Sequence, residues 1–135
     1  MAQNRKVLIT EDEPSIKDLM SQLLQGEGYE VLHAGTGKDA LEAMKRENPC
    51  MIFLDFKMPG GMNGYETAEA LKTGEPPYRG KIVLVSGNFR QYEQMQNPEK
   101  YPRADEFFDG GYLDKPFKIA EFLEFVSRID ASPSQ

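Results

Sequence analysis

Hydrophobic and polar positions fall into two alternating patterns along this chain. Short apolar runs typical of buried strands are separated by stretches in which apolar residues recur at helical spacing. Because the two patterns alternate from end to end, they predict an α/β fold with a mostly parallel sheet and helices on both faces. The predicted strands are Lys6–Thr10, Tyr29–Ala34, Met51–Asp55, Lys81–Ser86 and Gly111–Asp114.

Local signals indicate where the helices begin. Pro14 suits the first turn of a helix, where a backbone N–H is not needed. Thr36 and Asn63 are placed to cap the second and third helices with their side-chain oxygens. The last helix is predicted from a stripe of apolar side chains, namely Phe117, Ile119, Phe122, Leu123, Val126 and Ile129.

The regular pattern is lost between Gly87 and Gly110. Asn88–Gln96 could form a helix, but Pro98 and Pro102 exclude one continuous helix across the segment. We therefore expect an irregular or lengthened fourth-helix region. Two interpretations stay open: a partner-specific surface, or an insertion that is simply tolerated because long loops cost little additional closure entropy.

Length and composition limit the function classes. A chain of 135 residues predicts a single domain, with a core over about residues 5–130 and a frayed tail at 131–135. The net charge of -6 argues against direct binding to nucleic acid. No apolar run approaches the roughly 20 residues that span a bilayer, so no membrane contact is expected. Cys50 is the only cysteine, and a cytoplasmic setting is expected.

Chemically active side chains follow the predicted strands. Glu11 and Asp12 come directly after the first strand, and Asp55 ends the third. Ser86 ends the fourth strand, and Lys115 follows the fifth. Because the carboxyl ends of parallel strands meet at one edge of a sheet, these side chains are predicted to form one site.

The charges of this predicted site indicate its chemistry. Three carboxylates repel one another unless a hard cation such as Mg²⁺ lies between them. Lys115 and Ser86 offer a positive charge and a hydroxyl to the oxygens of a phosphoryl group. A carboxylate can itself carry a phosphoryl group as an aspartyl phosphate. The combination predicts metal-assisted transfer of a phosphoryl group onto Asp55.

The order of these motifs resembles the receiver domain of two-component response regulators over about residues 5–130. The resemblance implies a flavodoxin-like, doubly wound parallel sheet of five strands in the order 2-1-3-4-5. It also implies a cis peptide bond between the lysine and the proline of the last motif. The motifs are Glu11-Asp12, Asp55 with Met58-Pro59, Ser86, and Lys115-Pro116-Phe117.

The resemblance implies a role for each residue of the metal site. A sensor histidine kinase or phosphotransfer protein would supply a phosphohistidine, and the domain would catalyse its own phosphorylation and dephosphorylation at Asp55. Mg²⁺ would be held by Asp12 and Asp55 directly, by Glu11 largely through water, and by the backbone carbonyl of Lys57. Ser86 would contact the phosphoryl oxygens, as would Lys115 and the backbone N–H groups of Phe56 and Gly87.

The same resemblance implies a switch. Ser86 would move toward the phosphoryl group, and Tyr112 on the fifth strand would rotate, reshaping the surface that binds a downstream protein, whose identity stays open. Lys57 and Asn88 are candidate modulators of the site. Lys57 either lies over the phosphoryl group and alters its lifetime, or is a solvated lysine that points away.

Three other functions compete with the receiver interpretation. The first is a receiver-like adaptor that no longer uses phosphate. The second is an aspartyl-phosphate hydrolase of the haloacid dehalogenase type, but its Asp-x-Asp motif would need an acid where Lys57 stands. The third is a flavodoxin, but Met58-Pro59-Gly60 lacks a loop that could cradle a phosphate at a helix N-terminus.

Overall fold

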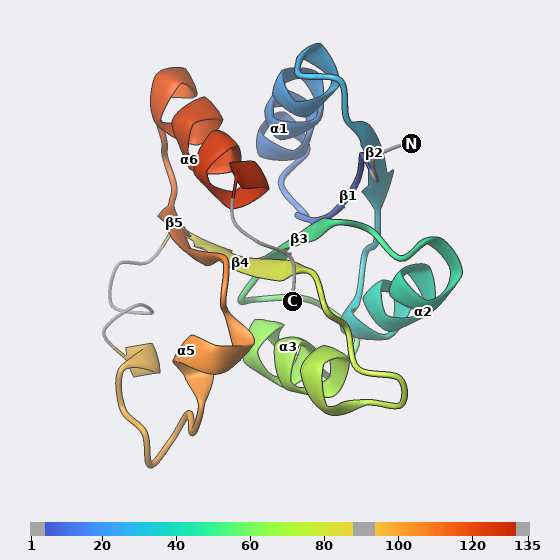
Figure 1. Ribbon diagram of the computed structural model, residues 1–135. Coiled ribbons are helices and arrows are strands. Elements are labelled where there is room, and N and C mark those ends of the chain that lie inside the picture. The colour runs from blue at the N-terminus through green and yellow to red at the C-terminus, as the bar shows by residue number, and fades with distance from the viewer. Residues whose placement is uncertain (1–4, 88–93, 132–135) are drawn as a thin grey trace.

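The computed structural model describes residues 5–87 and 94–131 (Figure 1). Asn88, one of the two candidate modulators, and residues 132–135 of the predicted tail 131–135 lie outside this range, whereas Ala131 is the last residue of a helix. The strands are β1 (Lys6–Thr10), β2 (Glu30–His33), β3 (Met51–Asp55), β4 (Lys81–Ser86) and β5 (Gly111–Asp114). The helices are α1 (Pro14–Gly26), α2 (Gly37–Glu47), α3 (Gly64–Thr73), α5 (Ala104–Phe107) and α6 (Ile119–Ala131).

The strands form one parallel sheet in the order β2-β1-β3-β4-β5, which confirms the predicted topology. α1 and α6 cover one face of the sheet, while α2, α3 and α5 cover the other (Figure 1). Successive residues of a strand point to opposite faces, so Leu8 and Ile9 belong to different cores. Both faces are therefore apolar, as the continuous apolar runs indicated.

The predicted helix starts are confirmed with small changes at the edges. The Thr36 side chain accepts the backbone N–H of Asp39, and Asn63 forms a capping box with Glu66. The second strand covers Glu30–His33 and is therefore shorter than the predicted Tyr29–Ala34. The last helix begins at Ile119, so Phe117 lies before it and instead stacks on Phe122 with ring centroids 5.1 Å apart.

The region before β5 is irregular, as expected. Its described part, residues 94–110, contains the helical residues Gln94 and Met95, turns, and the four-residue α5, which Arg103 precedes in a left-handed conformation (φ 63°). Tyr101 and Phe107 are nevertheless buried, at 8% and 2% exposure. Within the described ranges, no helix is both long and apolar enough to cross a membrane.

Candidate functional site

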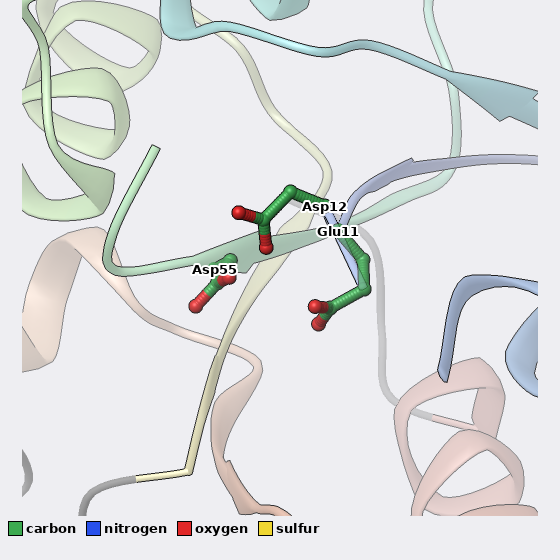
Figure 2. A group of neighbouring side chains, drawn as sticks. All are labelled: Glu11, Asp12 and Asp55. Carbon is green, nitrogen blue, oxygen red and sulfur yellow. The ribbon is translucent and has the colours of Figure 1, made fainter. Parts of the chain in front are cut away.

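Three carboxylates gather at the carboxyl edge of the sheet. Glu11 and Asp12 follow β1, Asp55 ends the adjacent β3, and one oxygen of each lies within 4.8 Å of the others (Figure 2). Glu11 and Asp55 are buried at 6% and 8% exposure, whereas Asp12 is exposed. Three hard oxygen donors in one place fit a divalent cation such as Mg²⁺. The three acids therefore converge at one edge of the sheet, as the sequence predicted.

Thr10 ties β1 to the strand that carries Asp55. Its hydroxyl accepts the backbone N–H of Asp55 at 3.2 Å and donates to the carbonyl of Phe53 at 3.3 Å. Thr10 is only 2% exposed. Sequence reasoning missed this residue, although a hydroxyl at the end of an apolar strand was a signal that could have found it.

Close backbone packing of α3 also supports the end of β3. A Cβ atom on Gly64 would lie 2.6 Å from the carbonyl oxygen of Asp55, and the Gly64 N–H donates to the Phe56 carbonyl at 2.7 Å. Only glycine allows this approach of α3 to the end of β3. The position of Asp55 is therefore fixed by backbone contacts as well as by Thr10.

Lys115 reaches the cluster but pairs mainly with Glu11. Its ammonium donates to the two Glu11 carboxylate oxygens at 2.9 and 3.1 Å and lies 3.8 Å from Asp55 Oδ2. The peptide bond between Lys115 and Pro116 is cis, as the resemblance implied. Burial lowers the pKa of Lys115, but the hydrogen bond to Glu11 and the charge of Asp55 outweigh it, so the net pKa is raised. The ammonium therefore stays charged.

The environment of Asp55 disfavours its charged form. Burial is the main reason that the pKa of Asp55 rises from its ordinary 3.8 to about 7. The Lys115 ammonium opposes this rise, while the carboxylates of Glu11 and Asp12 add to it. A cation placed among the three acids would stabilise the carboxylate, because it brings positive charge to the site.

An open cavity of about 310 Å³ gives access to this cluster. A water molecule takes about 30 Å³, so the cavity can hold a hydrated cation and a phosphoryl group. The cavity brings together most of the residues that the sequence analysis selected, whereas Glu11 and Tyr112 are not among its lining residues. Its lining residues are Asp12, Glu13, Asp55, Phe56, Lys57, Ser86, Gly87 and Lys115.

Tyr112 lies on β5, one strand away from Ser86. The register pairs Leu84 with Tyr112 and Ser86 with Asp114. The half-buried Tyr112 donates its hydroxyl to Asp105 Oδ1 at 3.0 Å. Asp105 belongs to the irregular segment, and sequence reasoning did not select it, because no local pattern places α5 beside β5.

Comparison with known proteins points to one family. The family model of the response regulator receiver domain matches residues 7–127. Sporulation initiation phosphotransferase F of Bacillus subtilis (strain 168) is 28% identical over 125 residues, which are 93% of each chain. The transcriptional regulatory protein PdtaR of Mycobacterium tuberculosis is 31% identical over 123 residues. These residues cover 90% of this chain but 55% of PdtaR, so this chain spans about half the length of that relative.

Solved structures share the same fold. The response regulator TrrA from Thermotoga maritima, in complex with Mg²⁺ and BeF, is 28% identical with a TM-score of 0.75 over 93% of this chain and 98% of TrrA. The chemotaxis response regulator CheY4 of Vibrio cholerae is 28% identical with a TM-score of 0.75, covering 94% of this chain and 99% of CheY4.

Proposed function

We propose that this chain, which belongs to the response regulator receiver domain family, accepts a phosphoryl group on Asp55 from a phosphohistidine. The observation that carries this proposal is the convergence of Glu11, Asp12 and Asp55 within 4.8 Å beside the Lys115 ammonium, with Asp12, Asp55 and Lys115 lining an open cavity. A sensor histidine kinase or a phosphotransfer protein would supply the group. The similarity to Sporulation initiation phosphotransferase F along 93% of both chains supports such a role in a phosphorelay.

The acidic residues would hold the metal ion. Asp12 and Asp55 would bind Mg²⁺ directly, Glu11 largely through water, and Lys57 through its backbone carbonyl. The oxygen donors of the cluster support this assignment, as does the Mg²⁺ complex of the relative TrrA. When bound, the ion would neutralise charge that develops on the transferring oxygens.

The transfer itself would be a displacement at phosphorus. A carboxylate oxygen of Asp55 attacks the phosphorus atom, the P–N bond to the donor imidazole breaks, and the imidazole nitrogen leaves with the bonding electron pair and takes a proton. Asp55 must be deprotonated to attack. Its pKa of about 7 already includes the opposing charge of Lys115, so the positive charge of the ion would be what keeps Asp55 ionised at neutral pH.

Two residues would then contact the transferred group. Lys115 would turn from Glu11 toward a phosphoryl oxygen, which requires only a small movement because its ammonium already lies 3.8 Å from Asp55. Ser86, which lines the cavity, would donate its hydroxyl to another oxygen. The backbone N–H groups of Phe56 and Gly87, also in the cavity lining, would assist.

Through the proposed switch, phosphorylation of Asp55 would change the surface that binds a downstream protein. Ser86 would move toward the phosphoryl group, and Tyr112 would rotate and change the surface around β5. Lys57 lines the cavity and would modulate the lifetime of the phosphoryl group. We further propose that residues 1–135 form one receiver domain that acts in the cytoplasm, in keeping with a sequence that contains a single cysteine and so cannot form a disulfide within the chain.

Mass spectrometry of the intact protein tests this function. With acetyl phosphate and Mg²⁺, the wild-type chain should gain one labile phosphoryl group, and an Asp55→Ala variant should gain none. Omitting Mg²⁺ should abolish the gain. A wild-type chain that stays unmodified, and that also fails to bind beryllofluoride, would contradict the proposal and favour a phosphate-independent adaptor.

A further inference from the structure

The irregular segment 94–109 is packed against α3 by aromatic side chains. The ring of Tyr65 on α3 contacts Tyr101 and Phe107, with centroid distances of 5.1 and 5.9 Å. The Tyr65 hydroxyl also donates to the carbonyl of Pro102 at 2.7 Å. In Figure 1, α5 lies beside α3 on the same side of the sheet. These contacts fix the segment in place although most of it is irregular.

This segment contacts the residue that follows the phosphoacceptor. The ring of Phe56 meets Tyr101 edge to face, with centroids 6.2 Å apart and an interplanar angle of 81°. Phe56 lines the cavity that contains Asp55. The segment therefore has one point of contact next to the proposed site of phosphorylation.

Its second point of contact is the proposed switch residue. Asp105 accepts the Tyr112 hydroxyl at 3.0 Å, and the Phe108 ring lies 5.9 Å from that of Tyr112. Asp105 is itself exposed, but it stands between the buried side chains of Ala104 and Phe107, which are 4% and 2% exposed. The acceptor of this hydrogen bond is consequently held on a well-anchored turn.

We propose that Asp105 is a positioning residue for Tyr112, and that the segment around α5 responds through this hydrogen bond when Asp55 is phosphorylated. The inference rests on the proposed function, because the switch requires Tyr112 to rotate. Rotation carries the hydroxyl away from an acceptor that cannot follow it, so the hydrogen bond breaks. The segment then loses one of its links to the sheet and opens more easily.

Loss of one exposed hydrogen bond to a carboxylate should have a measurable effect. The local opening of residues 104–109 should become roughly two- to tenfold more frequent, as expected for the net contribution of such a bond. The amides of this segment should therefore exchange their hydrogens faster by the same factor when Asp55 carries a phosphoryl group or its mimic.

Hydrogen–deuterium exchange of the whole chain, with and without Mg²⁺ and beryllofluoride, tests the inference. In the wild type, the mimic should speed exchange at residues 104–109 and alter it around Asp55. Tyr112→Phe removes the donor but keeps the ring, and Asp105→Ala removes the acceptor. Both variants should exchange fast at 104–109 without the mimic and respond no further, while the response around Asp55 persists.

Two further variants serve as controls. Asp105→Asn keeps an acceptor oxygen and should restore the response at 104–109. Glu106→Gln changes the neighbouring exposed acid, which pairs with Arg103 at 3.0 Å, and should behave as wild type. A wild type that responds around Asp55 but not at 104–109 would overturn this inference alone. Variants that respond like the wild type would overturn it too, whereas no response anywhere would overturn the proposed function itself.

Discussion

Replacing Asp55 with asparagine should stabilise the metal-free protein, and the gain should depend on pH. Well below pH 3.8 the carboxyl group is protonated in both the folded and the unfolded chain, so it contributes no pH dependence. As the pH rises from 3.8 to about 7, the unfolded chain releases this proton first, and the free energy of unfolding falls. Above pH 7 the cost is constant, because both states are ionised.

The size of this cost follows from the raised pKa. A rise from 3.8 to about 7, at about 1.4 kcal/mol per pKa unit, corresponds to roughly 4 kcal/mol of lost stability. The carboxylate borders an open cavity, and solvent there reduces the penalty. We therefore expect Asp55→Asn to raise the free energy of unfolding at pH 8 by about 2–4 kcal/mol, and to have little effect at pH 4.

Urea unfolding at pH 4, 6 and 8 in the presence of a chelator measures this effect, with circular dichroism as the signal. Asp12→Asn is the matched control, because it removes an exposed acid of the same cluster and should change stability much less. Added Mg²⁺ should stabilise the wild type more than the Asp55→Asn variant, since the variant lacks one ligand. Equal stability of Asp55→Asn and the wild type at pH 8 would refute the burial argument.

Three further predictions test other parts of the site. Thr10→Val leaves the buried N–H of Asp55 without its acceptor and should cost about 1–3 kcal/mol in urea unfolding; an unchanged midpoint would show that this bond contributes nothing. Glu11→Gln should weaken Mg²⁺ binding roughly 10- to 100-fold in calorimetry, as expected for a ligand acting through water, and equal affinity would remove Glu11 from the metal site. Lys57→Asn should change the lifetime of the phosphoryl group in a timed phosphate-release assay, whereas an unchanged lifetime would show that Lys57 does not modulate it.

The convergence of Glu11, Asp12 and Asp55 was predictable from the sequence. Apolar runs located the strands, and parallel strands place their carboxyl ends at the same edge. Any acid that follows two adjacent strands must then approach its counterpart. The resemblance to receiver domains supplied the strand order, which periodicity alone does not determine.

The partner of Lys115 was not predictable in the same way. The sequence places the lysine at the correct edge, but the choice between Glu11 and Asp55 depends on ångström differences in side-chain reach. The longer glutamate side chain brings both of its oxygens to the ammonium, at 2.9 and 3.1 Å. Such geometry is determined by tertiary packing rather than by spacing along the chain.

The contact between Asp105 and Tyr112 lay beyond sequence reasoning for a related reason. The segment that carries Asp105 has no hydrophobic period and is interrupted by Pro98 and Pro102. Its conformation is set by packing on Tyr65, which lies far away in the sequence. Local rules therefore predicted correctly that the region is irregular, but not which of its side chains would meet β5.

Asp55 is the residue that we propose receives the phosphoryl group. Borohydride reduces an aspartyl phosphate to homoserine, so treating the phosphorylated protein and sequencing its peptides by mass spectrometry locates the modified residue directly. We expect homoserine at position 55 in the sample treated with acetyl phosphate and Mg²⁺, and none in the sample without the phosphodonor. Homoserine at another acidic residue, with position 55 intact, would contradict this proposal.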